Sequence, residues 1–137
     1  MGPIRHFLGI NVRRTKDGFF LSQLAYAEDL LERAGMANCN PVATPANTKP
    51  KASAADGKLI DDATTYRSIA GALQYLTITR PDIAYAVQQV CLYMDAPRDV
   101  HQTMLKRILR YVKGTTSLGI QLRAAPSPTI TAYSDAD

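Results

Sequence analysis

The alternation of apolar and polar residues near the start of the chain predicts a β-hairpin. Apolar side chains alternate loosely across residues 6–12, and the pair Asp17-Gly18 is typical of a tight reversal between two strands. Apolar residues resume directly after this pair. We therefore expect a hairpin over about residues 6–21.

A helix and then a long loop are expected after the hairpin. Apolar positions recur at helical spacing over about 23–34, with Ser22 as a candidate N-cap and Gly35 as a C-terminal stop. Residues 36–60 contain three prolines among small and polar residues, a composition that predicts a loop. A loop of this length inside a compact domain is usually functional or a linker.

Three more helices and two short strands complete the predicted order. Apolar periodicity of the helical kind covers about 63–78, 82–94 and 99–113, and strand-like runs cover about 118–122 and 129–133. The expected caps are Asp61 or Asp62 for the first of these helices, a capping box of Thr79 and Asp82 for the second, and Asp99 and Gly114 for the ends of the third. The order predicts a helix-dominated α+β fold with an N-terminal β-hairpin, about four helices and two short C-terminal strands.

Composition narrows the class of protein. The 137 residues are 46% hydrophobic, which is too apolar for a disordered chain, and no run approaches the roughly 18 apolar residues of a membrane span. Cys39 and Cys91 match no zinc or redox spacing, so we expect an intracellular, reducing compartment and no membrane insertion. The cytoplasm is the first expectation. The basic N-terminal stretch leaves the mitochondrion as a second one.

The net charge of +4 is concentrated in one segment. Residues 98–123 hold six Lys and Arg against the single acid Asp99, whereas residues 1–34 hold five against four and residues 35–97 hold five against five. A local excess of this kind indicates a basic surface.

The candidate binding residues follow from this excess. Lys106, Arg110 and Lys113 share one helical face with Arg107 beside them, and we expect them to contact nucleic-acid phosphates together with Arg13, Arg14 and Lys16. The alternative is a solvated polar face on an ordinary amphipathic helix.

Other polar residues are given structural roles. Asp61 and Asp62 could hold Mg²⁺ if a turn presented them together, but a helix N-cap is the simpler interpretation. His6 and His101 have no partner at a catalytic spacing, and each is expected to be a surface or half-buried histidine. We therefore expect no metal site and no cofactor.

Several segments, read together and in order, resemble copia-type retrotransposon polyproteins, in the region that ends the reverse transcriptase. The residues that carry the resemblance are His6-Phe7-Leu8-Gly9-Ile10, Phe20-Leu21-Ser22-Gln23, Tyr26, Leu30-Leu31, Gly35-Met36, Cys39, Pro41, Tyr66-Arg67, Gly71, Leu73, Tyr75-Leu76, Thr79-Arg80-Pro81-Asp82-Ile83, Pro97, His101, Lys106 to Tyr111, Lys113-Gly114-Thr115 and Tyr133-Ser134-Asp135-Ala136-Asp137. The match covers nearly the whole chain.

The resemblance implies an incomplete reverse-transcriptase fold. Residues 1–123 would be the end of the palm with a primer-grip-like hairpin, the thumb and the connection, and residues 124–137 would begin the RNase H strand. The family's aromatic-x-Asp-Asp hairpin, which binds Mg²⁺ in the parent enzymes, is not among the 137 residues. Asp135 would align with one RNase H ligand, and two-metal chemistry needs several carboxylates. The chain by itself is therefore expected not to be an enzyme.

These observations leave three functions open. The first is a non-catalytic fragment, from a polyprotein piece or a decayed element, that self-associates, binds a host protein or binds RNA and DNA backbone weakly. The second is a part of an active RNA-directed DNA polymerase and RNase H that needs the missing palm. The third is an inert fragment. Unpaired strand edges favour self-association, most simply as a dimer, unless the terminal strands pair with the hairpin internally.

Overall fold

The computed structural model describes residues 6–47 and 53–124, and their secondary structure is α+β as expected. Three strands come first in the chain, four α-helices and a short 3₁₀-helix follow, and a fourth strand comes last. The four strands form one antiparallel sheet. The bounds are His6–Phe7 for β1, Ile10–Thr15 for β2, Gly18–Ser22 for β3, Leu24–Arg33 for α1, Ala63–Leu76 for α2, Pro81–Ile83 for η1, Ala84–Cys91 for α3, Asp99–Lys113 for α4 and Gly119–Arg123 for β4.

The sheet has the strand order β1-β2-β3-β4, with all neighbours antiparallel. The predicted hairpin is confirmed as β2 and β3, which pair from Asn11 opposite Ser22 to Thr15 opposite Gly18. The expectation of one strand from residue 6 to residue 12 is wrong, because Leu8 and Gly9 take left-handed φ values of 51° and 80° and turn the chain between β1 and β2.

Strand β4 returns from the far end of the sequence to pair with the hairpin. It lies antiparallel to β3, with Phe20 opposite Gln121. Of the two ways to cover the hairpin's edge, the internal one is therefore realised at β3. The second predicted C-terminal strand, about 129–133, lies outside the described residues.

Helix α1 follows the sheet and confirms the first predicted helix. Ala27, Leu30 and Leu31 form its buried face, and Gly35, with a φ of 70°, follows the helix end. Ser22 does not cap it, because Ser22 still belongs to β3. Gln23 holds the N-cap position, and its side chain makes no capping hydrogen bond to the helix.

Helix α2 confirms both its predicted cap and its predicted core face. The Asp62 carboxylate accepts the backbone N–H of Thr65 at 3.0 Å, so it satisfies a donor that the helix leaves open. The apolar positions expected to face inward are buried, namely Tyr66, Ile69, Leu73 and Leu76.

The next helical segment is split and shorter than predicted. It begins as η1 and continues as α3, which ends at Cys91 rather than near residue 94. The capping box is wrong because its two residues have other partners. The Thr79 hydroxyl bonds the Gln23 side chain at 2.8 Å, and the Asp82 carboxylate bonds Arg80.

Helix α4 has the predicted bounds but different ends. Arg98 occupies the N-cap position, and Asp99 is the first helical residue, whose carboxylate accepts the backbone N–H of Lys58 at 3.2 Å. Gly114 is the C-cap with a φ of −81°, so it is right-handed rather than the left-handed C′ residue expected.

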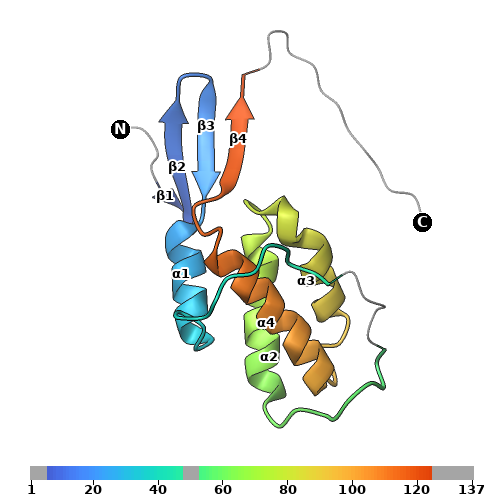
Figure 1. Ribbon diagram of the computed structural model, residues 1–137. Helices are drawn as coiled ribbons and strands as arrows, with labels where there is room; N and C mark the ends of the chain where they lie inside the picture. The colour runs from blue at the N-terminus through green and yellow to red at the C-terminus, as the bar shows by residue number, and fades with distance from the viewer. Residues whose placement is uncertain (1–5, 48–52, 125–137) are drawn as a thin grey trace, which may run out of the picture.

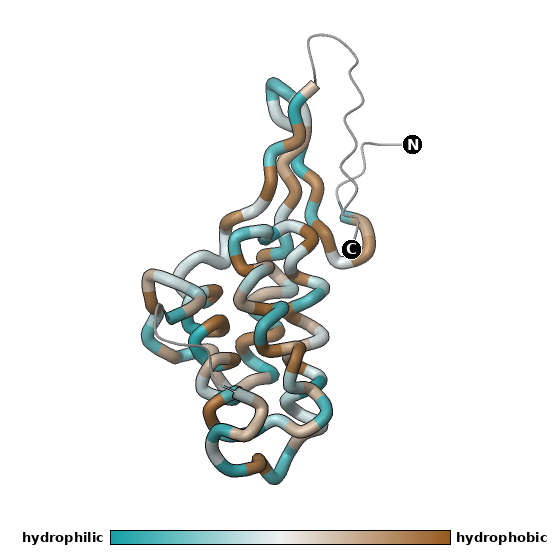
Figure 2. The backbone as a smooth tube through the Cα atoms, turned by 90° about the vertical axis from the view of Figure 1, so that its right-hand side faces the viewer, coloured by the Kyte–Doolittle hydropathy of each residue, from teal (hydrophilic) through white to brown (hydrophobic). Residues whose placement is uncertain are grey.

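The core lies among the helices, and the sheet projects from one end of them. The buried apolar side chains come from α1, α2, η1, α3 and α4. Figure 1 shows α4 crossing in front of α2 with α1 and α3 on either side, and β2, β3 and β4 standing above this body. The tube in Figure 2, turned by 90°, again places the strands beyond the helices, so none of the described helices covers the outer part of the sheet.

Candidate nucleic-acid interface

The basic residues of the hairpin are exposed but do not share one face. Arg13 pairs in register with Phe20, and Arg14 pairs with Phe19, so the two arginines point to opposite faces of the sheet. The Arg13 guanidinium lies 5.0 Å from the centre of the Phe20 ring, a cation–π contact. Lys16 is exposed in the turn between the strands.

The basic residues of α4 differ in exposure. Lys106 is exposed, whereas Arg107, Arg110 and Lys113 are half-buried. Figure 1 places the turn between β2 and β3 at the far end of the sheet from α4, so the two predicted basic groups form separate surfaces.

A segment of the long loop lies across α4 and holds two of its arginines. Arg107 donates from its NH2 group to the Thr44 hydroxyl at 2.8 Å, and Arg110 donates from Nε to the Asn40 carbonyl at 2.8 Å. The backbone N–H of Val42 donates in turn to the Arg110 carbonyl at 3.4 Å. We call residues 39–44 the strap.

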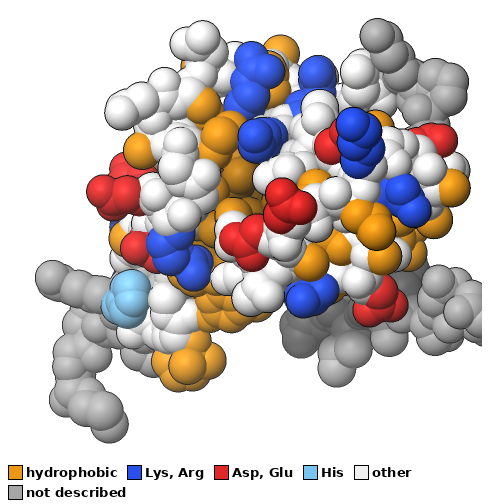
Figure 3. Space-filling model, turned by 90° about the horizontal axis from the view of Figure 1, so that it is seen from below, with side chains coloured by type: hydrophobic (Ala, Val, Ile, Leu, Met, Phe, Trp, Pro, Cys, Tyr) orange, Lys and Arg blue, Asp and Glu red, His pale blue; other side chains and the backbone are white. Residues whose placement is uncertain are grey.

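The basic stripe of α4, which consists of Lys106, Arg107, Arg110 and Lys113, is therefore only partly open. Lys106 is exposed, whereas Arg107 and Arg110 each donate a hydrogen bond to the strap. Figure 3 shows the lower face of the molecule, where Lys and Arg side chains are interspersed with acidic and hydrophobic ones rather than merged into one basic field.

Among the described residues, none of the seven predicted cations pairs with a carboxylate. The ion pairs found there are Arg33 with Asp29, at 3.1 Å, and Arg80 with Asp82, at 2.9 Å. The positive charge of the seven is therefore not neutralised by the part of the chain that the structure describes. The seven residues are Arg13, Arg14, Lys16, Lys106, Arg107, Arg110 and Lys113.

Arg80 is a buried cation that the sequence analysis did not single out. Its guanidinium is 1% exposed and bonds both oxygens of Asp82, the carbonyl of Thr115 at 2.8 Å and the hydroxyl of Thr115 at 2.6 Å. Tyr111 donates its hydroxyl to the same Asp82 carboxylate at 2.6 Å. This cluster ties the start of η1 to the end of α4, where the chain turns toward β4.

These contacts shift two pKa values in opposite directions. Partial burial alone would raise the pKa of Asp82, but the hydrogen bonds from Arg80 and Tyr111 outweigh it, and the pKa lies below its ordinary value. The hydrogen bond to Asp82 raises the pKa of the Tyr111 hydroxyl above its ordinary value. The cluster is thus built to keep Asp82 ionised.

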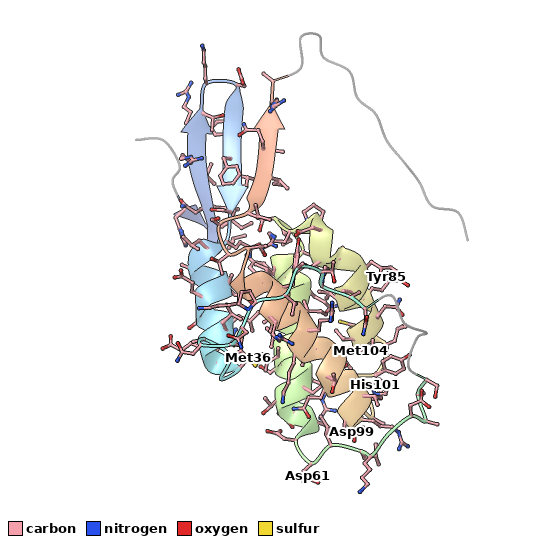
Figure 4. The ribbon with its side chains drawn as sticks, viewed as in Figure 1. Met36, Asp61, Tyr85, Asp99, His101 and Met104 are labelled. Carbon is pink, nitrogen blue, oxygen red and sulfur yellow. The ribbon has the colours of Figure 1, made fainter. Side chains whose placement is uncertain are left out.

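His101 is fully buried, whereas it was expected to be half-buried or at the surface. Its Nδ1 accepts the backbone N–H of Arg98 at 2.9 Å, so Nε2 carries the proton and donates to the Ser53 carbonyl at 3.0 Å. Figure 4 shows Asp99 and His101 together at the first turn of α4, and Asp61 on the chain below α2. His101 therefore fastens the loop to the helix. No pattern in the sequence indicated this role, because the expected N-cap was Asp99 rather than Arg98.

Asp62 is engaged as a helix cap rather than held open for a metal ion. Both Asp62 oxygens are engaged by Thr65, one by the backbone N–H and the other by the hydroxyl. Within residues 6–47 and 53–124, no group of three or more His, Cys, Asp or Glu side chains is placed to share a metal ion. Asp135 lies outside the described residues. None of the helices within the described residues is long and apolar enough to cross a membrane.

The amino-acid sequence is similar to retrovirus-related Pol polyproteins from plant transposons. It is 47% identical over 134 residues to the polyprotein from transposon RE2 of Arabidopsis thaliana, and 36% identical over 146 residues to that from transposon TNT 1-94 of Nicotiana tabacum. The two alignments cover 98% and 100% of this chain but only 9% and 11% of the polyproteins.

A shorter protein is also similar to the chain over its whole length. An uncharacterised mitochondrial protein of Arabidopsis thaliana is 45% identical over 137 residues, which is 100% of this chain and 57% of that protein. No family model matches the chain, and no solved structure matches it. The relatives support the expected relationship to copia-type retrotransposon polyproteins, of which this chain corresponds to a small part.

Proposed function

We propose that this chain, whose homologues are retrovirus-related Pol polyproteins of plant transposons, is a non-catalytic reverse-transcriptase segment that binds nucleic-acid backbone without reading its sequence. The segment would be the end of the palm, the thumb and the connection. The observation that carries the proposal is the set of seven cations that no described carboxylate neutralises. Phosphate contacts from such cations give affinity and register but little sequence information.

The non-catalytic part of the proposal rests on the sequence and on Asp62. The aromatic-x-Asp-Asp motif of the resembled family is not among the 137 residues, and Asp62 is engaged as a helix cap. Within a longer polyprotein the same segment would serve an active polymerase whose carboxylates lie elsewhere. For this chain by itself, we expect no Mg²⁺-dependent primer extension, and extension by the purified chain would overturn this part.

Salt dependence of binding to a random 20-base-pair duplex tests the binding itself. Three to five phosphate contacts give a slope of log K against log [salt] of about −3 to −4.5. The double variant Lys106→Ala/Lys113→Ala should weaken binding and make the slope shallower by about 2, since it removes two contacts. The matched control is Arg33→Ala, because Arg33 already pairs with Asp29. Equal binding by the parent, the double variant and the control would contradict the proposal.

A second candidate function is self-association through the projecting sheet. The register puts Val12, Phe19, Leu21, Ile120 and Leu122 on one face of the sheet, which they share with Ile10 and Arg14. Phe19 is 45% exposed and Leu122 is 49% exposed. The strand order leaves β4 with one open edge among the described residues, and such an edge recruits further strands. A second copy of the chain is the simplest partner.

A further inference from the structure

The strap and a phosphate group would use the same donors of Arg107 and Arg110. The strap offers these guanidinium groups neutral acceptors, the Thr44 hydroxyl and the Asn40 carbonyl. A phosphate offers charged oxygens, and hydrogen bonds between two ionised groups are roughly twice as strong as neutral ones. Phosphate is therefore the better ligand for the two arginines.

The strap also leaves one buried donor of Arg107 unsatisfied. Among the described residues, Nε of Arg107 is shielded from solvent and has no acceptor. A buried donor without a partner is unfavourable, and it lowers the free energy needed to exchange the strap for a ligand that supplies more acceptors.

Contact between the strap and the end of α4 is close at a single glycine. A Cβ placed on Gly114 would lie 2.9 Å from the Cβ of Pro41, which is too close for both to stay in place. Gly114 itself has a right-handed φ of −81°, so alanine suits its backbone. The closed position of the strap thus requires a residue without a side chain at position 114.

We propose that the strap is a displaceable cover over a phosphate-binding face of α4, and that bound nucleic acid and the closed strap exclude each other at Arg107 and Arg110. This inference rests on the proposed function, because it concerns the regulation of the same surface. When the strap is closed, the phosphate contacts of the stripe come from Lys106 and Lys113 alone. Opened, it adds two arginines. By linkage, nucleic acid must loosen the strap by the same factor as strap release tightens binding.

The test is the double variant Thr44→Val/Gly114→Ala, which removes the acceptor of Arg107 and pushes Pro41 away while leaving every cation in place. The matched control is Gly71→Ala, whose added Cβ meets nothing within 4 Å. Circular dichroism establishes that both variants keep the parent's helix content. Exchange of the Val42 amide, which is hydrogen-bonded to Arg110, establishes that the strap has opened.

Binding to the 20-base-pair duplex then gives the answer. We expect the double variant to bind at least fivefold more tightly than the parent, with a salt slope steeper by about 2, since two phosphate contacts are added. We also expect the duplex to speed exchange of the Val42 amide in the parent. Equal or weaker binding by a variant with an open strap would overturn the inference while leaving the proposed function standing. An absence of binding by parent and variant alike would overturn both.

Discussion

Arg80 and Asp82, on either side of Pro81, face each other through two hydrogen bonds, of 3.0 Å from Nε and 2.9 Å from NH2. The arginine is almost completely buried, while the Asp82 side chain is 35% exposed. Because the same guanidinium also holds Thr115, this pair sets where the chain leaves α4 for β4. The packing of the sheet on the helices therefore depends on a charge pair at the start of η1.

Replacing Asp82→Asn should lower the free energy of unfolding by about 1–3 kcal/mol at pH 7. Breaking a fully buried pair costs about 3–5 kcal/mol, and the exposure of Asp82 reduces that figure. Urea unfolding of parent and variant measures the difference. An unchanged midpoint would mean that Thr115 alone satisfies Arg80.

The same variant should show a specific pH dependence. The pKa of Asp82 lies below its ordinary value of 3.8, so its stabilising contribution is complete above about pH 4 and is lost as pH falls through the lowered pKa. The difference in unfolding free energy between parent and variant should therefore shrink as pH falls below about 4. Asp56 and Asp62, whose pKa values are also lowered, are present in both proteins and cancel. A gap that stays constant with pH would contradict the role given to Asp82.

Periodicity predicted the helical core well because apolar residues spaced three and four apart lie on the same face of a helix. The face of α2 that packs inward, from Tyr66 to Leu76, follows directly from apolar residues three and four apart. The Asp62 cap was also predictable, since a carboxylate before a helix has a local partner three residues on.

The predicted helix ends that are wrong are those where a residue outside the expected cap pattern offers a better partner. Asp82 was expected to cap locally, but Arg80 takes both its oxygens, and Thr79 bonds Gln23, which is 56 positions away in the chain. The candidate site was limited in the same way. Helical spacing places Arg107 and Arg110 on one side of α4 but carries no sign of the strap, whose contacts span more than sixty residues.

The buried hydroxyl of Tyr66 gives a second measurable change. It donates to the Val90 carbonyl at 2.6 Å, which fastens α2 to α3. Tyr66→Phe should lower the free energy of unfolding by about 1 kcal/mol, the usual net value of such a bond. The loss is modest because the Val90 carbonyl also accepts the backbone N–H of Tyr93. Thermal unfolding checks it against Tyr85→Phe on the exposed side of α3.

The stabilities of the parent and of Tyr66→Phe should also respond differently to alkaline pH. Burial raises the pKa of Tyr66 above its ordinary value of 10.0, so the folded state keeps the proton and its stabilising effect is lost as pH rises above about 10. The parent should therefore lose more stability than Tyr66→Phe between pH 9 and pH 11. Parallel losses would show that the hydroxyl titrates alike in the folded and unfolded chain.

The buried His101 should be needed for the hold of the loop on α4. Its ring stacks on Tyr93 with centroids 3.8 Å apart and planes 6° apart, and both its nitrogens are hydrogen-bonded. His101→Phe keeps an aromatic ring for the stack but removes both bonds, so we expect a loss of about 2–3 kcal/mol. Hydrogen exchange at the Lys58 amide, which bonds Asp99, should quicken in this variant and not in His6→Phe.

Self-association through the sheet predicts a difference between two neighbouring residues of β4. Leu122 lies on the apolar face with Phe19, whereas Gln121 pairs with Phe20 on the opposite face. Leu122→Lys puts a charge into the proposed contact, because an ammonium group is costly to bury without a partner. Gln121→Lys adds the same charge to the same strand but leaves that face unchanged.

Light scattering after size exclusion, at tens of micromolar protein, should show that the parent and Gln121→Lys self-associate and that Leu122→Lys is monomeric. If both lysine variants dissociate equally, the open edge of β4 holds the copies together, since a lysine on either face protects an edge strand. A monomeric parent would rule out self-association as a function of this sheet.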